Sequence, residues 1–155
     1  MPLNLQALKR LTGLYEVIEE QAAIALRKKM LEANNARQAV ERQTDVIRTA
    51  GSELRQALML SDQEKAALVT AESEYAVLAR EAMEEIVAER EIQSSLARTK
   101  FLEQRIKLEQ IKRLHEDVRA ELAVEQGRRQ QAMADDRFLA LKAIRRQANR
   151  LEIEK

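Results

Sequence analysis

The chain has 155 residues, of which 34% are charged and only 3% aromatic; it has no Cys or Trp, one proline and three glycines. This composition is typical of long helices and coiled coils and argues against a β-sheet, because helix breakers and strand formers are both scarce. The 27 basic and 26 acidic residues alternate along the chain and give a net charge of +1, so the sequence lacks the basic stripe that a nucleic-acid partner requires.

Motifs for chemistry, export and membrane insertion are missing from the sequence. It contains no phosphate-binding loop, nucleophile elbow or His-based zinc motif, and without Cys it has no thiolate ligands. We therefore expect no enzymatic activity, catalytic residue, cofactor or metal site, and we interpret His115, the only histidine, as a residue of a helix seam. No window approaches the roughly 20 apolar residues of a membrane span, and the start at Met1 lacks a secretory signal, so we expect a cytoplasmic protein without direct membrane insertion.

The first predicted helix covers residues 4–58 and carries a coiled-coil seam. Apolar residues recur at alternating spacings of three and four, which draws one narrow stripe along a helix. A step of eleven residues from Tyr15 to Leu26 is a stutter, which relaxes the supercoil without ending the helix. The predicted seam positions are Leu8, Leu11, Tyr15, Ile18 and Ala22, followed by Leu26, Met30, Ala33, Val40, Ile47, Leu54 and Leu58.

A turn is predicted between residues 51 and 62. Gly51 suits a helix C-cap, and the run from Ser61 to Glu64 resembles a capping box that opens a new helix. Because Leu54 and Leu58 keep the heptad period, the turn could instead lie nearer residues 58–62.

The second predicted helix covers residues 62–148 and repeats the spacing of three and four with one shift of phase. Its predicted seam positions are Leu68, Ala71, Tyr75, Leu78 and Ala82, then Ile92, Leu96, Thr99, Leu102 and Ile106, then Leu108, Ile111, His115, Val118 and Leu122.

These patterns predict an all-α protein: two long helices that form an antiparallel coiled-coil hairpin, with the C-terminal helix longer, in a single domain over residues 1–155. Residues beyond about 120 then have no partner within the chain, although they include large apolar side chains. A parallel homodimeric scaffold, in which Gly51 merely bends a continuous helix, is the alternative architecture. The apolar residues of the overhang are Met133, Phe138, Leu139, Leu141 and Ile144.

The segment from Gln130 to Leu139 resembles the C-terminal signature of the FliJ-like (SctO-like) stalk proteins of flagellar and type III secretion export machines. The resemblance covers about ten residues, and elsewhere it is one of length and architecture. The family pattern carries onto Met133, Asp135, Asp136 and Phe138, whereas Ala134 and Arg137 interrupt it.

The resemblance implies a non-enzymatic stalk in the cytoplasm, peripheral to the inner membrane, that inserts into the pore of a hexameric export ATPase. It further implies a link to the export gate membrane protein, with export chaperones as additional candidate partners. An escort chaperone for export substrates is the other functional alternative. We expect the overhang to bind its partner through Phe138, Leu139 and Ile144 as apolar contacts, with Asp135, Asp136, Arg145 and Arg146 as orienting charges.

Overall fold

The computed structural model describes residues 4–153 as two helices joined by a tight turn, α1 (Leu5–Met59) and α2 (Gln63–Ile153). Residues 4–153 contain no strand, and the prediction of an all-α hairpin with a longer C-terminal helix is confirmed. The predicted domain of residues 1–155 includes residues 1–3 and 154–155, which lie outside the described part of the chain.

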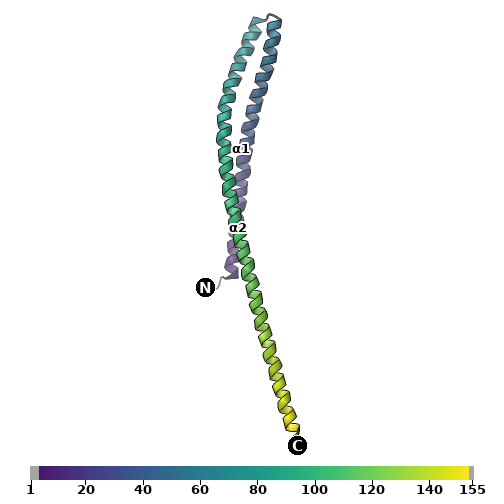
Figure 1. Ribbon diagram of the computed structural model, residues 1–155. Helices are drawn as coiled ribbons and strands as arrows, with labels where there is room; N and C mark the ends of the chain where they lie inside the picture. Colours follow the sequence, from purple (N-terminus) through teal and green to yellow (C-terminus); the bar gives the residue numbers. More distant parts are fainter. Residues whose placement is uncertain (1–3, 154–155) are drawn as a thin grey trace. The chain divides into compact units, whose positions relative to one another are not determined.

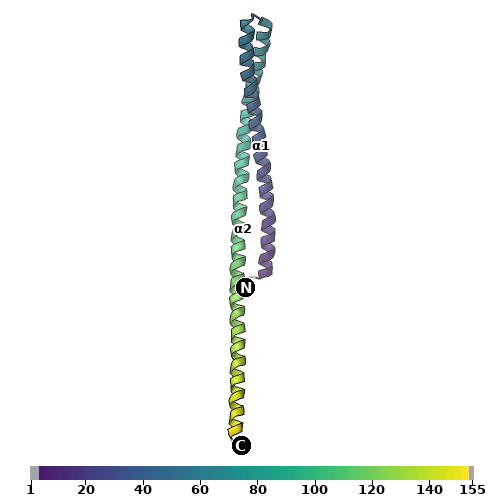
Figure 2. The same ribbon diagram turned by 90° about the vertical axis from the view of Figure 1, so that its right-hand side faces the viewer.

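The chain divides into two compact units, each containing parts of both helices. The first combines residues 1–14 with residues 108–155, and the second is residues 15–107. Within the second unit, α1 and α2 run antiparallel from the turn, side by side in both views (Figures 1 and 2).

The turn is a Schellman motif, in which two amide groups past the helix end bond back to its last carbonyls. The N–H of Asp62 donates to the carbonyl of Ala57 at 2.9 Å, and the N–H of Ser61 donates to that of Leu58 at 3.2 Å. Ser61 has a φ of 54°, the left-handed conformation that this motif requires. Asp62 then caps α2, because its Oδ1 accepts from the N–H of Lys65 at 3.0 Å.

Two details of the predicted turn are therefore wrong. Gly51 lies inside α1, with no positive φ, and does not end the helix. The N-cap is Asp62 rather than Ser61, because Ser61 is already used as the left-handed residue that closes α1. The turn falls at residues 60–62, where the continued heptads of Leu54 and Leu58 allowed it.

Glycine at position 61 is expected to stabilise the hairpin. A non-glycine residue in the left-handed conformation costs about 1 kcal/mol, and Ser61→Gly removes most of this cost. The same change at Ser52, an exposed residue inside α1, is the matched control, and there it should destabilise by about 0.5–1 kcal/mol. Urea unfolding of both variants measures the two effects, and a loss of stability in Ser61→Gly would contradict the turn conformation.

The predicted seam of α1 agrees with the structure at most positions. Leu8, Ala22 and Ala33 are buried, and Leu11, Met30 and Leu58 are exposed. At the three exposed positions a neighbouring residue takes the place in the seam, namely Thr12, Lys29 and Ala57. The predicted residues that are half-buried are Tyr15, Ile18, Leu26, Val40, Ile47 and Leu54.

The predicted seam of α2 is wrong between residues 68 and 106. The side chains predicted to face α1 are exposed, including Leu68 at 70% and Tyr75 at 74%. Most of the buried or half-buried positions instead form a second heptad stripe on a nearly opposite face, displaced by two residues. This inner stripe is made of Ala66, Val69, Ser73, Ala76, Arg80, Met83, Val87, Arg90, Ser94, Ala97, Phe101 and Gln104.

In the first unit the predicted seam of α2 is confirmed. Leu108 is buried, and Ile111, His115 and Val118 are half-buried at the predicted spacing. Leu122, the last predicted position, is exposed at 38%. Its exposure begins the stretch of α2 that makes no seam.

Candidate functional site

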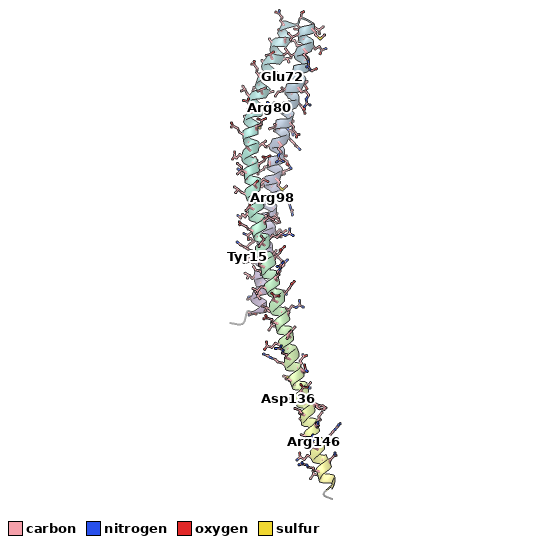
Figure 3. The ribbon with its side chains drawn as sticks, viewed as in Figure 1. Tyr15, Glu72, Arg80, Arg98, Asp136 and Arg146 are labelled. Carbon is pink, nitrogen blue, oxygen red and sulfur yellow. The ribbon has the colours of Figure 1, made fainter. Side chains whose placement is uncertain are left out.

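The C-terminal segment, residues 121–151 of α2, is the most distinctive surface of the first unit. Every residue in it is exposed, although the helix continues through it without a break. Figure 3 shows Asp136 and Arg146 on this stretch, beside which no second helix runs. The large apolar side chains of the segment that are 57–65% exposed are Val124, Met133, Phe138, Leu139, Leu141, Ile144 and Leu151.

Helical periodicity divides the predicted site residues between two faces of the C-terminal segment. Met133 and Ile144 are eleven residues apart, close to three full turns, and therefore share a face with each other. The other side of the helix carries Asp135, Leu139 and Arg146, which are separated from one another by four and seven residues. The predicted set is thus not one patch.

One apolar stripe in this segment contains residues that the predicted set of contacts left out. Leu141, Ile144, Ala148 and Leu151 recur at spacings of three, four and three, and Phe138 lies one turn before Leu141. Leu141 and Leu151 are the contacts that were left out. Their heptad spacing from Ile144 is the signal in the sequence that identifies them.

The charges of the segment are mostly free of ion pairs along the described chain. Arg129 pairs with Glu125 one turn earlier on the same helix. Asp135, Asp136, Arg145 and Arg146 have no such partner among residues 4–153. An incoming surface can therefore pair with these charges without first breaking an intramolecular contact.

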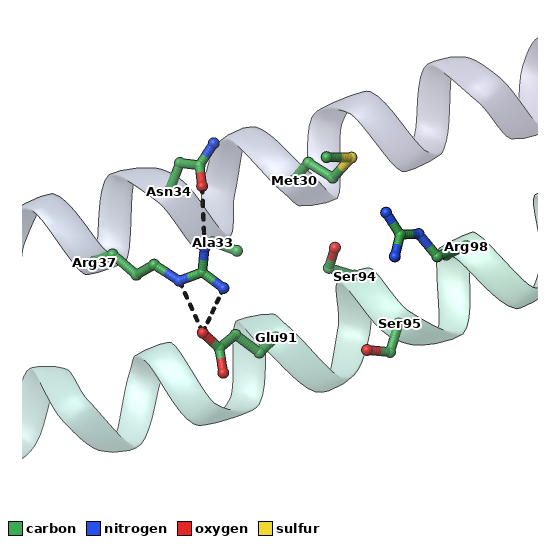
Figure 4. A pocket seen from close by; sticks show the side chains of 8 residues that line it. All are labelled: Met30, Ala33, Asn34, Arg37, Glu91, Ser94, Ser95 and Arg98. Carbon is green, nitrogen blue, oxygen red and sulfur yellow. Dashed lines mark hydrogen bonds and ion pairs between the residues drawn. The ribbon is translucent and has the colours of Figure 1, made fainter.

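A groove between the helices of the second unit is lined in part by polar groups (Figure 4). Here Ala33 faces Ser94, and these small side chains leave space between α1 and α2. Arg37 closes one side of the groove with an ion pair to Glu91, Nη2 to Oε1 at 2.6 Å, and its Nη1 donates to Asn34 at 3.5 Å. The arrangement joins the two helices through a neutralised pair of charges. Among the described residues, no group of acidic or imidazole side chains could hold a metal ion.

A second polar contact joins the helices at Glu32. Its Oε2 accepts from Lys29 at 3.2 Å on α1 and from Arg90 at 3.0 Å on α2. Lys29 also donates to Gln93 Oε1 at 3.3 Å. The hydrogen bond from Lys29, aided by the nearby positive charges, lowers the pKa of the Glu32 carboxyl below its usual 4.5.

This shift predicts how the contact depends on pH. Because the pKa of Glu32 is lower in the folded chain, the carboxylate stabilises the fold above pH 4.5, and the effect is lost as pH falls through the lowered pKa. Glu32→Gln should therefore melt at a lower temperature than the native chain at pH 7, and the difference should shrink towards zero at strongly acidic pH. A difference of equal size at both pH values would show that the charge of Glu32 is not what stabilises the contact.

Comparison with family models, curated proteins and solved structures finds no match to this chain. Neither helix, over the described residues, has a stretch long and apolar enough to cross a membrane. The class of protein that the fold defines is a helical hairpin with an exposed helical extension.

Proposed function

We propose that this chain is a non-enzymatic coiled-coil stalk that binds the pore of a hexameric export ATPase of the flagellar or type III secretion type. In this role it promotes assembly and activity of the ring and links the ring to the export gate at the inner membrane. The observation that carries the proposal is the C-terminal segment, in which an unbroken helix exposes apolar side chains and both signs of charge. The resemblance of residues 130–139 to the FliJ-like signature supports the choice of partner.

A single exposed helix suits the interior of a ring better than a flat surface does. A helix with its side chains is about 10–12 Å across and presents contacts on every side, so several subunits of a ring can touch it at once. The two faces of the segment fit this mode: Ile144 and Met133 lie towards one side, whereas Leu139 and Arg146 lie towards the other. Many modest contacts hold such a helix without fixing it in one orientation.

ATP hydrolysis by a purified export ATPase, measured with and without the intact chain, tests the proposal. We expect the chain to raise both the hydrolysis rate and the fraction of ATPase assembled as hexamers. A hexameric ATPase with no role in export is the control and should not respond. No binding to any export ATPase would contradict the proposal, and stable capture of unfolded export substrates instead would favour the escort chaperone.

A further inference from the structure

The outer face of α2 in the second unit carries an apolar stripe that no other described residue of the chain covers. Its heptad positions run without a break in phase from Leu68 to Ile106, nearly opposite the inner stripe that faces α1. Leu78 is 65% exposed and Leu96 is 66% exposed. A helix with two such stripes is able to pack against two helices at once, and the hairpin supplies only one of them. The positions of the outer stripe are Leu68, Ala71, Tyr75, Leu78, Ala82, Glu85, Glu89, Ile92, Leu96, Thr99, Glu103 and Ile106.

The outer face is strongly acidic between residues 71 and 91. This stretch has seven acidic residues and two basic ones, so the expected alternation of charge does not hold here. Both bases are already used: Arg80 lies 3.5 Å from Glu84, and Arg90 bonds to Glu32 of α1. The acids at the edges of the outer stripe or within it, all exposed, are Glu72, Glu74, Glu81, Glu85 and Glu89.

This acidity disfavours direct pairing of two outer stripes from two copies. In a parallel arrangement in register Glu85 would face Glu85, and in an antiparallel arrangement centred on Val87 it would face Glu89. Like charges in a helix interface destabilise it and select against that pairing. The occupant of the outer face must therefore be an apolar helix that carries positive charge.

The chain itself contains such a helix at its C-terminal end. Residues 137–151 have five basic residues and no acidic one. They also carry the exposed apolar stripe of Leu141, Ile144, Ala148 and Leu151. None of the five bases has an ion pair within the part of the chain that the structure describes; they are Arg137, Lys142, Arg145, Arg146 and Arg150.

We propose that residues 137–151 of one copy dock on the outer face of residues 71–91 of a second copy. Both stretches belong to the single helix α2, and two stretches of one unbroken helix cannot pack side by side, so the contact forms between chains. The contact uses the chain alone and does not depend on the proposed ATPase.

An antiparallel register aligns the apolar spacing of the two stretches and brings the acidic stretch alongside the basic one. In this register each residue of one copy lies opposite the residue of the other copy whose number brings their sum to 226. The heptad positions of the two stretches then coincide over four successive intervals. Leu78 then faces Ala148, and Ala82 faces Ile144. The same register sets Glu89 opposite Arg137 within the seam, and it brings Glu81 and Arg145 to the same level at the edges of the seam. This register is the same whichever copy supplies residues 137–151. Each copy can therefore dock these residues on the outer face of the other, and the pair closes as a dimer.

Sedimentation equilibrium of the full chain with charge-reversed variants tests the docking. The tail variant is Arg137→Glu with Arg145→Glu, and the face variant is Glu81→Arg with Glu89→Arg. We expect the native chain to dimerise in low salt and less so in high salt, and each variant alone to dimerise at least about tenfold more weakly. An equimolar mixture of the two variants should recover the native affinity, because both contacts of the mixed dimer again pair opposite charges.

The matched control reverses two exposed acids of α1, Glu20→Arg with Glu41→Arg, and should leave dimerisation unchanged. Circular dichroism confirms that each variant is folded. A native chain that stays monomeric, or variants that are weakened but not rescued by mixing, would overturn the proposal. Flotation of the monomeric native chain with vesicles of anionic lipid, lost in the tail variant, would overturn it in favour of a membrane surface as the occupant of the basic end.

Discussion

Ala76→Asp is expected to lower the free energy of unfolding of the hairpin by about 3–5 kcal/mol, whereas Ala71→Asp should lower it by less than about 1 kcal/mol. Ala76 is 1% exposed on the inner stripe of α2, and Ala71 is exposed on the outer stripe. The two replacements are chemically identical and lie five residues apart on one helix. The difference between them therefore reports which face of α2 packs against α1.

The large cost arises because the Asp carboxylate at position 76 would lie against the apolar seam without a partner for its charge. Neighbouring buried positions are also small and apolar, namely Ala57 at 0% and Val69 at 3% exposure. At position 71 the carboxylate stays in water, and only the lower helix propensity of Asp acts. Urea unfolding at a concentration low enough to keep the chain monomeric measures both. Equal losses at the two positions, or the larger loss at position 71, would place the outer stripe against α1.

The sequence was enough to predict the hairpin because its evidence is local and repeated. Scarce helix breakers, long heptad runs and one pause near residue 60 permit few other folds. The position of the turn also followed from the heptads of Leu54 and Leu58, although the roles of Gly51 and Ser61 did not. Left-handed backbone at a serine is rare, so sequence preferences alone favour glycine for that position.

The inner face of α2 could not be predicted because the helix has two stripes and the more apolar one faces outwards. Periodicity locates a stripe on a helix, but it does not say which stripe meets the intramolecular partner. The buried seam is formed by small residues such as Ala50 and Ala57 on α1 and Ala76 on α2. Close packing of small side chains therefore outweighs the larger free energy that burying Leu68 or Tyr75 against α1 would give. The outer stripe then remains available for another helix.

The exposed C-terminal segment was predictable from the unequal helix lengths, whereas its faces were not. A count of residues shows that α2 is longer than α1, and therefore that the described residues beyond about 120 have no second helix to pack against. The choice of Leu139 and omission of Leu141 came from a resemblance in sequence, which weights residue type over angular position on the helix. Burial gives no help here, because every side chain of the segment is exposed.

Removal of residues 126–155 is expected to abolish stimulation of the export ATPase while leaving the second unit folded. The deletion takes away Met133, Phe138 and Ile144 together with the charges around them, and residues 126–151 within it are all exposed. Helical signal should fall in proportion to the deleted residues, but the unfolding transition of the remaining hairpin should be preserved, because the buried side chains lie between Leu8 and Leu108.

Phe138→Ala narrows the same test to one side chain. Phe138 is 65% exposed in the free chain, so its replacement cannot remove a packed intramolecular contact. If the side chain is buried between ring subunits, its loss should weaken binding by about 2 kcal/mol, or roughly thirtyfold, and a higher concentration of chain should restore the stimulation. Met59→Ala, an 86% exposed apolar residue near the turn, is the matched control and should stimulate like the native chain. Full stimulation by the truncated chain would move the ATPase contact to the hairpin and leave the C-terminal segment to another partner.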